Sequence, residues 1–147
     1  MSVLQKSDRI KCIDFHPVEP WALLCMFSGK VIVYDLDKKE IRNHFEPGYL
    51  PVRCGKFIAR KQWVVFGCDD LKIRVYNYNT GEKVFVTSLH QPQVKEWKAH
   101  DDYIRGIDVH ESQPFILTCG DDMLIKLWDW DNDFSLVRVA LSCSSEL

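Results

Sequence analysis

Residues 120–130 read GDDMLIKLWDW, and this stretch decides the fold of the chain. It opens with Asp121 and Asp122 directly after a glycine, a combination typical of a tight turn. The residues that follow would alternate between two faces in an extended chain, and they end on the dipeptide Trp128-Asp129. We therefore predict a turn followed by a β-strand over about residues 124–128.

Two earlier segments repeat the pattern of this stretch. Each copy has an apolar-basic pair, an aromatic-led apolar run, and a strand closed by an aromatic residue and Asp or Asn. The pairs are Ile10-Lys11, Val52-Arg53 and Ile104-Arg105, the runs start at Trp21, Trp63 and Phe115, and the closing dipeptides are Tyr34-Asp35, Tyr76-Asn77 and Trp128-Asp129. From Ile10 to Val52 is 42 residues, and from Val52 to Ile104 is 52. A period of about 40–45 residues that closes on Trp-Asp predicts the four-stranded blade of a β-propeller.

Period-two alternation predicts four strands in each copy. They cover about residues 10–16, 22–27, 31–34 and 41–45, then 52–58, 63–67, 73–76 and 83–85, then 104–110, 115–119, 124–128 and 134–139. The longer second interval is explained by an insertion over residues 86–95, whose polar content and Pro92 suit a surface loop. The predicted blades are residues 7–47, 49–98 and 100–139, followed by a non-repeat tail over 140–147.

The composition is that of a globular protein. Of the 147 residues, 46% are hydrophobic and 27% are charged, which argues against disorder over the whole chain. The net charge is −2 and the two signs are mixed along the sequence, so we expect no nucleic-acid partner. The N-terminus has no apolar h-region, and the longest unbroken apolar run covers residues 21–27. A signal peptide and a membrane span are therefore not expected.

The six cysteines are predicted to be reduced thiols of a cytosolic protein. They stand at positions 12, 25, 54, 68, 119 and 143 without any Cys-x-x-Cys motif. That scatter favours core thiols over a disulfide framework or a zinc site. The histidines have no metal-ligand spacing, no nucleophile motif such as G-x-S-x-G is present, and no glycine-rich phosphate loop follows a strand. We predict a binding role without catalysis, metal or cofactor.

The strings that carry the repeats resemble WD40 repeats, and in particular the N-terminal propellers of the beta-prime subunits of the COPI vesicle coat, or coatomer. These strings are SDRIKCIDFHPVEPW, LPVRCGKFIARKQWVVFGCDD, IRVYNYNTGEKV, AHDDYIRGI and DDMLIKLWDWD. The resemblance implies an all-β fold, an incomplete WD40 β-propeller of about three four-stranded blades. It also implies a coat subunit fragment of COPI transport between the Golgi and the ER, held peripherally on the cytosolic face of Golgi membranes and vesicles.

The resemblance further implies two kinds of partner. Propellers similar to this one recognise dilysine signals, Lys-Lys-x-x or Lys-x-Lys-x-x, at the extreme C-terminus of cargo membrane proteins, and they assemble with other coatomer subunits. By position, Arg9, Lys11 and Arg53 resemble the groups that face the terminal carboxylate of the tail. Asp102 and Asp121 resemble acceptors for its lysines, with Arg105 beside them. Phe27 stands where the family commonly has Tyr, and this departure removes a hydroxyl from the site.

The repeat positions of these residues favour the same site. Lys11, Arg53 and Arg105 share one repeat position at the mouth of the first strand, so three neighbouring blades would place three cations on one rim. Asp69 and Asp121 share another repeat position, at a turn expected at the same end. A rim with basic and acidic groups suits a ligand that carries both a carboxylate and ammonium groups.

A second set of polar residues is predicted to be structural. WD40 repeats commonly join a His, a turn Asp, a strand Ser or Thr and the Trp in an internal hydrogen-bond network. The residues of this sequence at those positions are His100, Thr118, Asp122 and Trp128. We expect this network to fix the geometry of a blade.

Three blades fall short of a ring. Propellers close with about 4–8 blades, and the family that this chain resembles has seven. The first and third blades would each leave an apolar face uncovered, and we expect a truncated product. Two functional interpretations stay open: a cargo-binding coat fragment, or a WD40 interaction scaffold or truncated product without independent peptide binding.

Overall fold

The computed structural model describes residues 8–79 and 93–141, and this part of the chain is all β. Three four-stranded antiparallel sheets follow one another, and within each sheet the strands lie in chain order. Blade 1 contains β1 (Ile10–Phe15), β2 (Trp21–Met26), β3 (Val31–Asp35) and β4 (Glu40–Phe45). Blade 2 contains β5 (Val52–Ile58), β6 (Trp63–Cys68), β7 (Lys72–Asn77) and β8 (Gln93–Lys98). Blade 3 contains β9 (Ile104–Val109), β10 (Phe115–Gly120), β11 (Leu124–Asp129) and β12 (Ser135–Leu141).

Two predicted boundaries are wrong. The strand that pairs with β7 in blade 2 is β8, and the predicted strand at 83–85 lies outside the described residues together with most of the predicted insertion. Residues 93–95 of that insertion belong to β8, where Lys95 pairs with Val75 of β7. The predicted tail at 140–147 also begins too early, because Ala140 pairs with Ile125 inside β12. In both cases backbone pairing with the inner strand, rather than the side-chain pattern, determines which residues form the outer strand.

The turn from the second to the third strand is repeated in all three blades. Its left-handed residue is Gly29 (φ 96°), Leu71 (φ 73°) or Met123 (φ 64°). In blades 2 and 3 the residue before it is an aspartate, whose carboxylate accepts the amide of Lys72 at 3.2 Å or of Leu124 at 3.1 Å. These local bonds help a non-glycine residue to hold a left-handed conformation at the turn.

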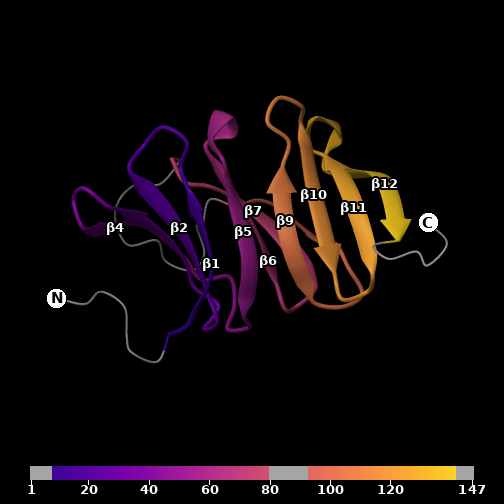
Figure 1. The fold of residues 1–147 in the computed structure, drawn as a ribbon, viewed down its shortest axis with the longest axis horizontal. Coiled ribbons are helices and arrows are strands. Elements are labelled where there is room, and N and C mark those ends of the chain that lie inside the picture. The colour runs from indigo at the N-terminus through magenta and orange to yellow at the C-terminus, as the bar shows by residue number, and fades with distance from the viewer. Residues whose placement is uncertain (1–7, 80–92, 142–147) are drawn as a thin grey trace.

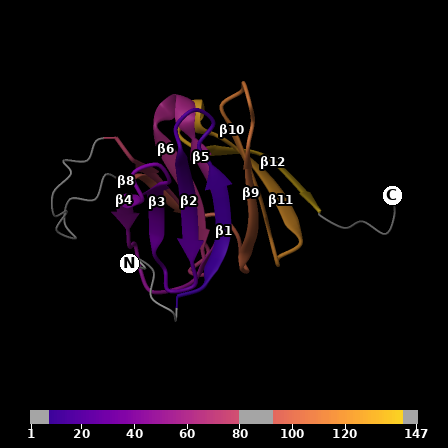
Figure 2. The same cartoon turned by 60° about the vertical axis from the view of Figure 1, so that its left-hand side comes forward.

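The three blades form a fan. The first strands, β1, β5 and β9, lie next to one another, and the later strands of each sheet spread outward (Figure 1). Figure 2 turns blade 1 toward the viewer, where its four strands lie side by side. The described residues form an arc rather than a closed ring. Two short 3-10 helices, η1 (Ala59–Lys61) and η2 (Trp130–Asn132), lie at strand ends.

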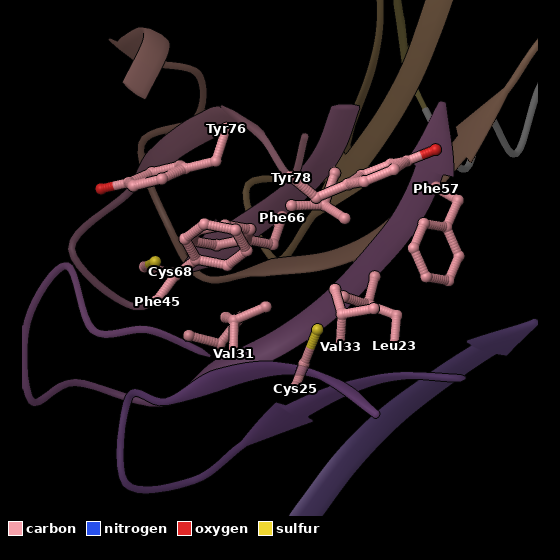
Figure 3. Packing of buried hydrophobic residues seen from close by; sticks show 12 residues of the cluster. Leu23, Cys25, Val31, Val33, Phe45, Phe57, Phe66, Cys68, Tyr76 and Tyr78 are labelled. Carbon is pink, nitrogen blue, oxygen red and sulfur yellow. The ribbon is translucent and has the colours of Figure 1, made fainter. Parts of the chain in front are cut away.

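Two hydrophobic clusters hold the fan together. The cluster between blades 1 and 2 is shown in Figure 3, where Leu23, Val31 and Val33 of blade 1 face Phe66 and other side chains of blade 2. The cluster between blades 2 and 3 contains Val65, Ile73, Ile107, Ile116 and Trp128, together with further residues of both sheets. Each blade therefore presents a similar set of repeat positions to the blade that follows it.

Candidate functional site

The predicted rim lies at one end of the fan, where each first strand begins and each second strand ends. This end is the lower edge of Figure 1, where β9 begins and β10 ends. A backbone hydrogen bond closes it in every blade, from Phe27 to Arg9 (2.8 Å), from Asp69 to Pro51 (2.9 Å) and from Asp121 to Tyr103 (2.8 Å). The three blades therefore present equivalent side-chain positions at this end.

In blade 2 the rim cation and the rim carboxylate bind each other. Arg53 donates from Nε to Asp69 Oδ1 at 2.8 Å and from Nη2 to Asp69 Oδ2 at 3.0 Å. The pair is shielded, since the Arg53 side chain is 18% exposed and that of Asp69 is 6% exposed. Two parallel bonds of this kind fix the guanidinium plane. Arg53 thus contacts a carboxylate of its own blade.

Blade 3 repeats the pair in a more open form. Arg105 donates from Nη2 to Asp121 Oδ2 at 2.8 Å and from Nε to both oxygens at 3.0 Å. These side chains are 48% and 39% exposed, so water screens the pair and a charged ligand can compete with it. The hydrogen bonds from Arg105 lower the pKa of Asp121, and the same bonds raise the pKa of Arg105.

Tyr103 connects the two pairs. The Arg53 guanidinium carbon lies 5.2 Å from the Tyr103 ring centroid, and the Arg105 carbon lies 5.7 Å from it. The resulting order is Asp69, Arg53, Tyr103, Arg105, Asp121, which crosses the boundary between blades 2 and 3. Tyr103 was not among the predicted site residues. It occupies the repeat position of Arg9, and that equivalence could have indicated it.

Blade 1 breaks the pattern, because Phe27 stands at the position of Asp69 and Asp121. The guanidinium of Arg9 lies over the Phe27 ring, 4.9 Å from its centroid. Lys11 is exposed. Within residues 8–79 and 93–141, neither Arg9 nor Lys11 forms an ion pair. Blade 1 thus presents two cations whose charge no described carboxylate neutralises by direct contact.

Asp102 lies beside these residues at the start of blade 3. It is exposed, and its Oδ1 accepts the amide of Tyr103 at 2.7 Å. It also contributes to the raised pKa of Arg105. The structure therefore brings Asp102, Arg105 and Asp121 together, whereas Arg9 and Lys11 lie two blades away on the same rim.

The residues of the predicted structural network are in contact. Thr118 Oγ1 lies 2.9 Å from Trp128 Nε1 and 2.8 Å from His100 Nε2, and His100 Nδ1 lies 2.9 Å from Asp122 Oδ2. Since indole N–H can only donate, Thr118 accepts from Trp128 and can donate to His100. Burial opposes ionisation of Asp122, but bonds from the Asp101 amide and His100 hold its pKa below the usual range.

Comparison with known proteins identifies this repeat. Residues 91–129 match the family described as "WD domain, G-beta repeat". This segment is similar to a WD40 repeat. The matched segment runs from the outer strand of blade 2 through β11 and includes His100, Thr118, Asp122 and Trp128. The hydrogen-bonded network thus lies within the segment that matches this repeat family.

Curated relatives match a larger part of the chain. It is 51% identical over 67 residues to "Coatomer subunit beta'" of Mus musculus and of Homo sapiens, which is 46% of this chain and 7% of each relative. The Drosophila melanogaster protein of the same name is 45% identical over 64 residues, 44% of this chain and 7% of the relative. The match thus spans less than a tenth of these relatives.

A solved structure supports the fold. One chain of "Crystal Structure of Mitotic Checkpoint Complex" superposes with a TM-score of 0.77 over 93% of this chain and 38% of that chain. At 12% identity this likeness concerns the fold alone. The expected all-β fold of three four-stranded blades is thereby confirmed. Neither of the described helices is long and apolar enough to cross a membrane.

Proposed function

We propose that this WD40-repeat chain is a coat-type binding module that captures lysine-bearing C-terminal tails on its rim. The observation that carries the proposal is the charge pattern across the blades. Arg9 and Lys11 lack carboxylate partners among the described residues, whereas Asp102 and Asp121 are exposed acids two blades away. A tail that ends in a carboxylate and carries ammonium groups complements both charges.

Each part of such a tail has a matching part of the rim. Lys11 and Arg9 would bind the terminal carboxylate, and Asp102 and Asp121 would accept from the lysines. The guanidinium of Arg53 is already bonded to Asp69, so it would not bind the tail carboxylate directly. Its role would be to orient Tyr103 and to add positive potential. Similarity to coatomer beta' subunits supports dilysine tails of cargo membrane proteins and other coat subunits as partners. It also supports peripheral association with Golgi and COPI membranes.

The expected affinity is modest. A hydrogen bond to a charged group contributes about 1.5–3 kcal/mol, and a micromolar site needs roughly 8 kcal/mol. Three or four contacts on an exposed rim therefore give micromolar binding at best. A coat can compensate for weak sites, because several linked sites raise the effective concentration of the tail.

A fluorescence polarisation titration tests the proposal. The probe is a labelled peptide that ends in Lys-Lys-x-x, and its twin carries a C-terminal amide. The free-acid peptide should bind at least about fivefold more tightly, since one charge-assisted contact is removed in the twin. Lys11→Ala should abolish this difference, whereas Lys38→Ala, which removes the same charge at the opposite end of blade 1, should preserve it. Equal binding of both peptides to the folded wild-type chain contradicts the proposal.

A second candidate function is an interaction scaffold. The observation that favours it is the exposed apolar face of blade 1, where Ile13 is 67% and Phe15 is 73% exposed. Exposed aromatic and aliphatic side chains on one sheet face are typical of protein contacts. Size-exclusion chromatography separates the two functions. A scaffold would still bind its protein partner through this face when the rim residues are substituted.

A further inference from the structure

One pair of facing positions on the first two strands contains at least one cysteine in each blade. The facing residues are Cys12 and Cys25 in blade 1, Cys54 and Gly67 in blade 2, and Gly106 and Cys119 in blade 3. Of these described pairs, the one in blade 1 alone places a thiol on both strands. The pattern makes blades 2 and 3 internal controls for the chemistry of blade 1.

The two thiols of blade 1 differ in access. Cys12 is partly exposed, and Cys25 is fully buried in the cluster between blades 1 and 2. Figure 3 shows the Cys25 sulfur near Val31, Val33 and Leu23. The Cys12 sulfur lies 3.6 Å from the carbonyl oxygen of Gly55 in blade 2. A solute can therefore reach Cys12, whereas Cys25 is not exposed to solvent.

The surroundings of Cys12 favour its thiolate. The hydrogen bond from the Cys25 thiol lowers the pKa of Cys12 to about 6 against the opposing effect of burial, with Asp14 and Lys56 as the facing charges. The pKa of Cys25 is raised by the same bond and by burial, so Cys25 keeps its proton. A thiolate beside a neutral thiol is the arrangement that redox-sensing cysteines use.

We infer that Cys12 and Cys25 form a peroxide-responsive thiol pair that closes to a disulfide between β1 and β2. In the first step the Cys12 thiolate attacks hydrogen peroxide, which forms an S–O bond, breaks the O–O bond and gives a sulfenic acid and hydroxide. In the second step the Cys25 sulfur attacks the sulfenic sulfur, and water leaves with the Cys25 proton. Facing residues of antiparallel strands have Cα atoms about 4.5–5.5 Å apart. This distance lies within the range of about 4.4–6.8 Å that is usual between the Cα atoms of a disulfide.

The bond would act beside the rim without using any rim residue. Cys12 follows Lys11 directly, and Cys25 packs where an added Cβ at Gly55 would come within 2.6 Å of its sulfur. Because the Cys25 sulfur fills the space that a side chain at Gly55 would need, drawing it toward Cys12 changes the packing of blade 1 on blade 2. The inference does not depend on peptide binding, and its test has a separate readout.

Mass spectrometry of the intact chain tests the pair. The folded chain is treated with hydrogen peroxide, free thiols are blocked with iodoacetamide, and the chain is mapped by proteolysis without reduction. The expected result is a peptide that links residues 12 and 25, lost in Cys12→Ser and kept in Cys119→Ser. In untreated wild type, Cys12 should react with iodoacetamide roughly tenfold faster than Cys119 at neutral pH. The rate for Cys12 should rise with pH and reach half of its maximum near pH 6.

Several results would overturn the inference. One is peroxide oxidation of Cys119 at the same rate as Cys12. A second is a Cys12 sulfenic acid that persists while Cys25 still reacts with iodoacetamide. A third is a disulfide from Cys12 to Cys54 or Cys68. Because Cys12 and Cys119 are compared within one wild-type molecule, the rate comparison stands even where a cysteine variant folds poorly.

Discussion

At the scale of single residues, repetition makes the roles of equivalent positions comparable. The sequence predicts that Asp69 and Asp121 share a position. The structure pairs each of them with the arginine 16 residues before it in the sequence. That pairing could not be predicted from spacing alone; each arginine lies beside a shift in the register of the first two strands, which the sequence pattern does not reveal. The network around His100 was predicted from the resemblance to WD40 repeats, in which residues of these types commonly form such a network, and its four members are in contact in the structure.

Thr118→Val should destabilise the chain. The substitution keeps the volume but leaves Trp128 Nε1 without its acceptor and His100 Nε2 without its partner, and Thr118 and His100 are each 1% exposed. An unsatisfied buried polar group costs about 1–3 kcal/mol, so the free energy of unfolding in urea should fall by about that amount. Ser112→Ala, in an exposed loop of the same blade, should change it little. Equal stability of Thr118→Val and wild type would show that the network is dispensable.

At the scale of strands and turns, alternation predicted most elements but not β8, the strand that pairs with β7 in blade 2. The apolar residues of β8, Val94 and Trp97, stand three residues apart, which breaks the period-two pattern. Pairing decides, because β8 places Trp97 opposite Ile73 and Glu96 within reach of Lys72. Trp97 also packs on Trp128 and Phe134 of blade 3.

The η1 turn of blade 2 clamps blade 3. Arg60 donates to the carbonyl oxygens of His110 (3.0 Å), Glu111 (2.8 Å) and Gln113 (2.6 Å), and its guanidinium lies 4.7 Å from the centroid of the Trp130 ring. One planar group thus satisfies three carbonyls of the turn between β9 and β10.

Arg60→Ala should loosen this turn. We expect a loss of about 1–2 kcal/mol in the free energy of unfolding, at the low end for charged hydrogen bonds because the site is exposed. Amides of residues 110–115 should exchange faster with deuterium, while those of blade 1 stay unchanged. Arg60→Lys keeps the charge without the fork and should recover only part of the protection. Lys61→Ala serves as the neighbouring control; an identical effect there would argue against a specific clamp.

At the scale of the whole molecule, the fan has two outer faces as well as two packed boundaries. The face of blade 1 carries Ile13 and Phe15, and the face of blade 3 carries Leu117, which is 43% exposed. The sequence predicted that these faces would be uncovered, and they are exposed in the structure. Such faces favour association of the isolated chain.

Phe15→Ser should reduce self-association of the 147-residue chain. Light scattering at several concentrations should show a smaller rise of apparent mass than in wild type, because a large exposed apolar side chain is removed from the sheet face. Val18→Ser is the matched control, since Val18 is 83% exposed but lies in the turn after β1. Equal effects of the two substitutions would mean that general surface apolarity, rather than the blade face, drives association.

The replacement of an acid by Phe27 in blade 1 gives the rim a polarity. Blades 2 and 3 neutralise their arginines internally, whereas the positive end of the arc keeps its charge in Arg9 and Lys11. This charge pattern favours one direction along the arc for a ligand with one anionic and one cationic end. Under the proposed function, a tail whose anionic end is its chain terminus would run from blade 1 toward blade 3, and Phe27 in the repeated turn would set that orientation.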